Sequence, residues 1–400
     1  MFKFLWLVSF LILSFDTFAE TFTKDSLVKE SSVNNNLDKS QNIAMNKNSK
    51  THKKYGNKRK NKGKQQEYSG DHSLKNIRMA VGSKAFSWLS GSPADNEKLS
   101  VGKTAQFFGF VALRYQSGRA ARRGSLGRSF YQIATDEQRQ IIHNAVLSED
   151  PIMKKWWQVR SQLLKQLEQY LYTGVAWDEE ELLKLGGEFG YLNAEAGRIE
   201  MQAFAEVEKL LTSAQWQQLH RWREDPALVT TNKVNRANVG LSRELTAQYE
   251  DLFAKSFSLF TGNFNDRKIV PLGQPAQFFG FVSIRHKSGK ISKQFYQLLT
   301  PEQSGYLKHA SQQLVSPTGE FMAVRTRLLQ ELDKLRLASN ETFDAKQYEE
   351  ISRQLGIIET RCAMIEAAGY KQVRASMSET QMAELMEIRS DYILDQGSIE

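Results

Sequence analysis

The residues that could bind a metal or react as a thiol are few in this sequence. It contains six histidines and one cysteine, Cys362. His143 and His309 lie 166 positions apart, near matching places of an internal repeat and each on an expected helix. A metal site on a helix needs a second ligand on the same face, three or four residues away, and neither histidine has one at clear spacing. We therefore expect no bound metal and no other cofactor, and a single cysteine excludes an intramolecular disulfide.

Sequence motifs of catalysis are not found either. The chain has no HExxH zinc motif, no G-x-S-x-G nucleophile turn and no phosphate-binding glycine loop. The glycine-rich residues 186–190 (GGEFG) lie inside a helical pattern rather than after a strand. Acidic residues are numerous, but they spread along expected solvated helix faces. These features predict a protein that is not an enzyme.

Four short motifs carry a different chemistry, the capping of helix ends. In a capping box, a Ser or Thr hydroxyl accepts a hydrogen bond from the amide three residues on, and a Gln side chain three residues on accepts from the capping residue's amide. The four motifs pair Thr135 with Gln138, Thr212 with Gln215, Thr300 with Gln303 and Ser378 with Gln381. Each predicts the start of a helix, so we expect these eight residues to be structural.

The capping boxes belong to two copies of one unit. Residues 105–111 (AQFFGFV) recur unchanged 171 positions later, at 276–282. Further along, the offset between the copies is 165 or 166 positions as far as the C-terminus. A fixed offset over this length indicates a tandem duplication. The sequence therefore predicts a first helical unit at residues 76–240 and a second at 241–400.

Apolar residues recur three and four positions apart in both units, which predicts an all-α fold. Capping residues, two of them followed by Pro, set the expected helix starts. These starts are Asp150-Pro151, Asp178, Ser316-Pro317 and Asp344. The corresponding ends are expected near Tyr172, Leu211, Leu337 and Ser376.

The repeated residues 105–111 and 276–282 are less clear. Each could be a buried helix ended by Gly or the first arm of a hairpin, and we favour the helix. Their aromatic side chains are expected in the core, with an exposed binding patch as the alternative. These side chains are Phe107, Phe108, Phe110, Phe278, Phe279 and Phe281.

Small residues recur at helical spacing in the long helix of each unit. They are Gly186, Gly190, Ala194 and Gly197 in the first unit, and Ser352, Gly356, Thr360 and Ala363 in the second. Gly inside a helix costs about 1 kcal/mol relative to Ala. A repeated stripe of this kind predicts that two helices approach closely, with a ligand groove as the less favoured alternative. Cys362 aligns with Ala196 and is expected to be a small buried residue.

Two adjacent pairs of large apolar residues lie at matching positions of the units, Trp156-Trp157 and Phe321-Met322. Neighbouring residues do not share a helix face, so at most one residue of each pair should be fully buried. The other could lie on a client-binding surface, where aromatic residues and Met adapt to varied partners. Packing in the core or between the units is the favoured alternative.

The N-terminus predicts export. An apolar run over residues 4–15 follows Lys3, and Thr17-Phe18-Ala19 offers a cleavage site, so residues 1–19 resemble a signal peptide. No other stretch is long and apolar enough to span a membrane. We expect a soluble periplasmic or secreted protein, cleaved near Ala19.

The basic charge is concentrated in one segment. The net charge is +9, and residues 50–64 alone hold eight Lys and Arg with no acid, which leaves +1 for the rest of the chain. Residues 20–75 are rich in Asn, Lys and Ser and poor in apolar residues, which predicts a disordered basic linker. It could touch lipopolysaccharide, an anionic membrane or nucleic acid. We favour a solvated spacer and expect no nucleic-acid partner.

The capping boxes also carry a resemblance to a known family. Residues 211–215 (LTSAQ) and 299–303 (LTPEQ) resemble the LTxxQ motif of the Spy/CpxP family of periplasmic proteins. Ala134 and Met377 replace Leu in the other two motifs. The order of motif, helical hairpin, long helix and second motif over residues 130–224 and 295–392 is also similar to that family.

The resemblance implies small helical units that pair into a curved cradle. Some members of the family are ATP-independent chaperones, some tune an envelope stress sensor kinase, and a related group senses heavy metals. This chain departs from the family because two units are fused and each has an extra N-terminal piece with a Phe-Phe-Gly-Phe segment. The fusion implies that one chain forms a pseudo-twofold cradle by itself, as a monomeric pseudo-dimer.

Three functions follow as expectations. The first is a periplasmic chaperone-like protein that binds unfolded, partly folded or stress-related polypeptides through Trp156, Trp157, Phe321 and Met322. The second is an envelope stress or heavy-metal sensor that binds a metal or a sensor kinase domain. The third is a structural envelope protein anchored by its basic linker.

Overall fold

The computed structural model describes residues 74–90, 123–225, 228–229, 240–261, 288–336 and 342–397. These residues form helices and turns without a strand, which confirms the predicted all-α class. All of these helices belong to one compact unit, residues 66–400. None of the helices in this described part is long and apolar enough to cross a membrane.

Several predicted segments lie outside the described residues. They are the signal peptide, the basic linker up to residue 73, and the repeated segments 105–111 and 276–282 with their six phenylalanines. The choice between helix and hairpin for the repeated segments therefore stays open.

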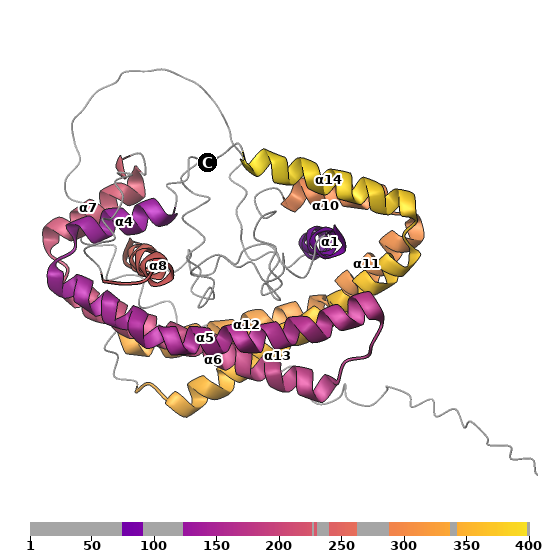
Figure 1. Cartoon of the computed structure of the whole chain (residues 1–400). Coiled ribbons are helices and arrows are strands. Elements are labelled where there is room, and N and C mark those ends of the chain that lie inside the picture. Colours follow the sequence, from indigo (N-terminus) through magenta and orange to yellow (C-terminus); the bar gives the residue numbers. More distant parts are fainter. Residues whose placement is uncertain are drawn as a thin grey trace, which may run out of the picture. The chain divides into compact units, whose positions relative to one another are not determined.

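The two sequence units have the same order of helices (Figure 1). The first contributes α1 (Leu74–Ser90), α4 (Arg123–Ile133), α5 (Asp136–Thr173), α6 (Glu179–Lys209) and α7 (Ser213–Glu224). The second contributes α8 (Arg243–Thr261), α10 (Ser288–Leu298), α11 (Pro301–Gln313), α12 (Val315–Arg336), α13 (Ala345–Ser376) and α14 (Glu379–Gly397). The main difference is that one long helix, α5, corresponds to two consecutive helices, α11 and α12.

The helix start predicted at Asp150-Pro151 is wrong, because α5 runs through Pro151 without a break. Proline removes the hydrogen bond to the carbonyl four residues earlier, that of Leu147. Leu147 is 47% exposed, so water can reach this side of the helix and satisfy that carbonyl. In the second unit the chain does interrupt the helix, at Leu314, and Pro317 lies in the first turn of α12.

The other predicted boundaries agree with the structure to within two residues. Asp178 and Asp344 cap α6 and α13, and their side chains accept hydrogen bonds from the amides of Glu181 and Gln347. The long helices end at Lys209 and Ser376. Local capping chemistry therefore sets the ends of these helices.

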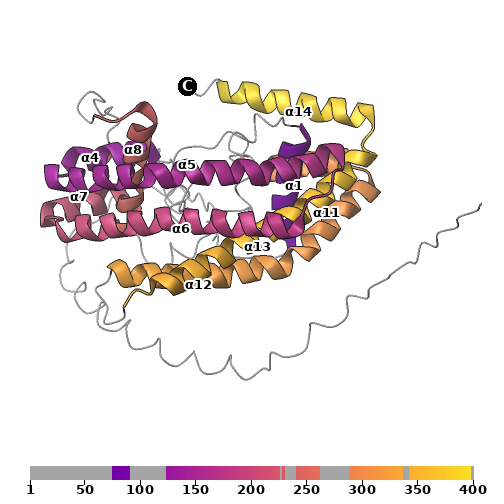
Figure 2. The ribbon, with the colours of Figure 1, turned by 60° about the horizontal axis from the view of Figure 1, so that its bottom comes forward.

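The long helices α5, α6, α12 and α13 pack together as a central layer (Figure 2). Within it, α6 packs along both α5 and α13, and α13 also packs along α12. Buried side chains from all four helices belong to the hydrophobic core, among them Leu163, Phe204, Leu328 and Tyr370. The centre of this core is thus shared by both sequence units.

The small-residue stripes lie where α6 crosses α13, as predicted. A β-carbon added at Gly190 would lie 2.6 Å from the backbone nitrogen of Gly356, and one added at Gly356 would lie 2.7 Å from Cα of Gly190. Real β-carbons do not come this close to backbone atoms. Gly190 and Gly356 are equivalent in the repeat, and contact between equivalent residues is expected where a twofold relation joins two copies.

The first helix of each sequence unit packs with the other unit. Helix α1 packs against α10, α11, α13 and α14, whereas α8 packs against α4, α5, α6 and α7 (Figure 1). Aromatic contacts show the same crossing, with Phe86 edge-on to Phe295 at 6.1 Å and Phe130 edge-on to Phe253 at 5.3 Å. We call α4–α7 with α8 the first half, and α10–α14 with α1 the second half. Each half is therefore completed by a helix from the other repeat.

Candidate functional site

The capping boxes of the first half form their reciprocal hydrogen bonds. The hydroxyl of Thr135 accepts from the Gln138 amide at 3.2 Å, and Gln138 Oε1 accepts from the Thr135 amide at 2.9 Å. Thr212 and Gln215 repeat both bonds at the same distances. Two otherwise unsatisfied amides are thereby paired at the start of α5 and of α7.

The two glutamines of the first half also bond to each other. Gln138 Nε2 donates to Gln215 Oε1 at 3.2 Å, and Gln215 Nε2 donates to Gln138 Oε1 at 2.8 Å. The same two Nε2 groups donate to the carbonyls of Leu210 and Ile133, which lie just past α6 and at the end of α4. Both glutamines are buried. A single amide pair therefore joins the α4–α5 corner to the α6–α7 corner.

The second half contains the same arrangement. Gln303 Nε2 donates to Ser376 O at 2.8 Å and to Gln381 Oε1 at 3.1 Å, and Gln381 Nε2 donates to Leu298 O and Gln303 Oε1, both at 2.9 Å. Thr300 and Ser378 supply the capping hydroxyls. The four motifs thus act as two pairs. Sequence reasoning identified the caps but missed the pairing, although a motif at each end of the same hairpin and long helix was the available signal.

The predicted client-binding residues divide between the core and its edge. Trp156 and Phe321 are 3% and 4% exposed, and Trp156 packs 5.0 Å from the ring of Phe189 on α6. Trp157 and Met322 are half-buried and pack against the same core from its edge. One residue of each pair is therefore fully buried, as helix geometry predicts. Of these four residues, only Trp157 and Met322 have side-chain surface within reach of a partner.

Charged groups bridge the helices of the central layer near these residues. Glu188 on α6 accepts hydrogen bonds from Lys155 on α5 and, at 3.0 Å, from Arg353 on α13. Burial raises the pKa of Glu188, but these two hydrogen bonds outweigh it and lower that pKa below the ordinary value. The Arg160 guanidinium lies 5.1 Å from the centre of the Trp157 ring. Lys155, Glu188 and Arg353 are partly exposed, so this layer carries charge of both signs at its surface, whereas Arg160 is buried.

Two buried ion pairs connect the two sequence units, one within each half, and sequence reasoning did not anticipate them. Lys84 of α1 pairs with Glu366 of α13, and Lys255 of α8 pairs with Glu200 of α6. All four residues are almost fully buried. Lys84 and Lys255 are equivalent in the repeat, as are Glu200 and Glu366, so the same contact is made twice. Burial raises the pKa of Glu366 to about 6, although Lys84 acts in the opposite direction.

The residues considered for metal or thiol chemistry are His143, His309 and Cys362. His143 is half-buried, with its ring 6.2 Å from that of Tyr249, and His309 is exposed. In the described ranges, no group of three or more His, Cys, Asp or Glu side chains is placed to hold a metal ion. Cys362 is buried, as its alignment with Ala196 predicts, and burial raises the pKa of its thiol.

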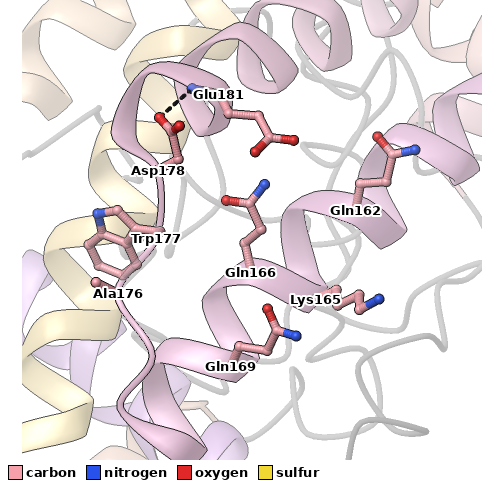
Figure 3. A pocket seen from close by; sticks show the side chains of 8 residues that line it. All are labelled: Gln162, Lys165, Gln166, Gln169, Ala176, Trp177, Asp178 and Glu181. Carbon is pink, nitrogen blue, oxygen red and sulfur yellow. Dashed lines mark hydrogen bonds between the residues drawn. The ribbon is translucent and has the colours of Figure 1, made fainter.

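A polar pocket of about 400 Å³ lies where α5 turns into α6 (Figure 3). Its lining consists of Gln162, Lys165, Gln166, Gln169, Ala176, Trp177, Asp178 and Glu181. The centre of the Trp177 ring lies 3.9 Å from that of the Tyr170 ring, with the two planes tilted by 41°. The Asp178 carboxylate caps α6 by accepting a hydrogen bond from the Glu181 amide at 3.1 Å. Two of the lining side chains thus have structural roles, and the others are three amides, two charged groups and one methyl group.

Comparison with known proteins identified no relative of this chain. No protein-family model matches the chain, and neither the curated proteins nor the solved structures compared with it gave a match.

Proposed function

We propose that this protein is an ATP-independent, chaperone-like protein of the cell envelope that binds unfolded or stress-related polypeptides. Two features support the proposal. The signal-like N-terminus favours a periplasmic or secreted location. The glutamine-paired capping motifs give the LTxxQ-like residues the same structural role in both halves, in keeping with the resemblance to the Spy/CpxP family.

The observation that carries the proposal is the placement of Trp157 and Met322. They occupy equivalent positions on α5 and α12 and keep part of their side chains exposed. Aromatic and thioether side chains adapt to many apolar partners. The nearby Lys155, Glu188 and Arg353 add charge of both signs to the same layer. A surface of this kind suits weak contact with many unfolded sequences rather than tight binding of one.

The mechanism follows from exposed area. A half-buried residue offers only part of its apolar surface, and burial contributes about 25 cal/mol per Å². Each contact with an unfolded client is therefore weak. Two equivalent contact sites in one chain increase the time a client stays bound through effective concentration. A client can then remain mobile while its apolar segments are kept from aggregating.

The test is binding of a fluorescently labelled, permanently unfolded polypeptide to the full-length protein, without nucleotide. The double variant Trp157→Ala/Met322→Ala should raise the dissociation constant about tenfold, because truncation of two interface anchors costs at least about 1.4 kcal/mol. Met386→Ala is the matched control, since Met386 is 47% exposed on a different helix, α14.

Equal weakening in the double variant and in the control would mean that exposed apolar surface in general, and not these two sites, carries binding. Absence of binding in the wild-type protein would contradict the proposal and favour a dedicated sensor or a structural envelope protein.

A further inference from the structure

Within the described residues, the main helix partners of α1 all belong to the second repeat. The Tyr296 hydroxyl donates to Arg78 O at 3.1 Å, and the Tyr370 hydroxyl donates to Val81 O at 3.4 Å. Arg389 of α14 donates to the Ser90 hydroxyl at 3.2 Å. Helices α10, α13 and α14 therefore each hold a different part of α1.

A buried charge pair adds to these contacts. Lys84 of α1 and Glu366 of α13 are 6% and 2% exposed. A buried ion pair often adds little net stability, but loss of one partner is strongly unfavourable because a buried charge is left unpaired. The pair thus favours a helix that has a Lys at this position, a feature that α1 shares with α8 through Lys255.

Shape makes the second half specific for α1 rather than for its repeat equivalent, α8. A β-carbon at Gly82 would lie 2.5 Å from both the Ser292 hydroxyl and the Tyr296 ring, so nothing larger than Gly fits there without movement. The residue equivalent to Gly82 in α8 is Phe253, which packs edge-on against Phe130 in the first half. Helix α8 therefore cannot replace α1.

The covalent connection does not decide which chain supplies α1. Residues 91–122 join α1 to α4, and a segment of this length can reach about 100 Å when fully extended. The Lys84 ion pair, the hydrogen bond to Ser90 and the close fit at Gly82 depend on the sequence of α1, and a second copy of this chain carries the same sequence. The groove formed by α10, α11, α13 and α14 is thus equally complementary to α1 of another molecule.

We propose that this groove is a docking site for α1 of a second copy, so that two chains associate by exchanging their α1 helices. Within one chain, docking has the advantage of a high effective concentration. Exchange is therefore favoured at high protein concentration, or when docking within the chain is blocked.

The test blocks docking within each chain and restores it only between chains. Variant Lys84→Glu places two carboxylates in the docking site, and variant Glu366→Lys places two ammonium groups there. In an equimolar mixture, α1 of each variant finds the opposite charge only on the other chain. We expect the separate variants to be monomers and the mixture to have twice the mass of one chain by light scattering.

The control is the double variant Lys84→Glu/Glu366→Lys, which restores the pair within one chain and should be monomeric with wild-type helicity. If the control folds but the mixture stays monomeric, the proposal is overturned. A second measurement needs no variant. Two wild-type preparations with different affinity tags, unfolded and refolded together at about 1 mM, should give mixed dimers by native mass spectrometry, and their absence would also overturn it.

Discussion

The crossing of α6 over α13 makes Gly190 a sensitive position. Replacement of Gly190 by Ala adds one methyl group, whose carbon would lie 2.6 Å from the Gly356 nitrogen and 2.7 Å from the Gly356 Cα. These atoms belong to the backbone of a 32-residue helix and cannot move independently of it. The variant can be accommodated only if the two helices separate.

The magnitude is the difference between two effects. Ala is favoured over Gly inside a helix by about 1 kcal/mol. Overpacking a core costs about 1–3 kcal/mol, and we expect the upper end because a rigid helix is the obstacle. The net result for Gly190→Ala is a loss of about 2 kcal/mol in the free energy of unfolding.

Gly187 provides a matched control on the same helix. It is also buried, but a β-carbon there would lie 3.6 Å from the Ile357 side chain, an ordinary contact. Gly187→Ala should therefore gain up to about 1 kcal/mol from helix propensity. Both free energies are measured by denaturant titration followed by circular dichroism. If Gly190→Ala were as stable as Gly187→Ala, the close crossing would be refuted.

Three further predictions concern other contacts. Gln303→Ala should lower the free energy of unfolding by about 2–3 kcal/mol, because it leaves buried partners in both corners unsatisfied. Gln312→Ala, at an exposed position, should change it little, and equal free energies of unfolding for the two variants would argue against the glutamine pair. Phe321→Ala should cost about 3–5 kcal/mol as a large core truncation, and a cost below 1 kcal/mol in the same titration would mean that this side chain is not in the core. The pKa of Glu366 in the folded protein is about 6, above its ordinary value of 4.5. Protonated Glu366 therefore contributes to the free energy of unfolding, in full below pH 4.5, and this contribution is lost as the pH rises through 6. Between these pH values the wild type should lose about 2 kcal/mol relative to Glu366→Gln, and parallel pH profiles would contradict the assignment.

Local signals in the sequence predicted much of the helical framework. The capping boxes at Thr135, Thr212, Thr300 and Ser378 start helices because their hydrogen bonds involve residues only three positions apart. The glycine stripes predicted a close crossing because a Gly inside a helix needs a compensating contact. These signals could be read without knowledge of the rest of the fold.

Contacts between distant residues were not predictable in this way. Pro151 has the features of a helix start, yet α5 continues through it, where water can reach the Leu147 carbonyl that loses its hydrogen bond. The Lys84–Glu366 pair joins residues 282 positions apart, and no short-range pattern marks either one as buried. The crossed docking of α1 and α8 was missed for the same reason. A repeat in the sequence identifies equivalent helices but does not say which copies pack together.

The pairing of Gln138 with Gln215 lies between these cases. The sequence showed two identical capping chemistries, and each glutamine had a complete role within its own motif. The structure adds that each amide group has a free Nε2 donor after capping, and that the other motif supplies its acceptors. A count of donors per glutamine would have suggested a second partner.

Aggregation of chemically denatured clients, followed by light scattering, tests the proposed function most directly. Several unrelated clients are diluted from denaturant with and without an equimolar amount of the full-length protein, in the absence of nucleotide. We predict that the wild type suppresses aggregation of all of them, and that Trp157→Ala/Met322→Ala suppresses it less than Met386→Ala. No suppression of any client by the wild-type protein would contradict the proposed function.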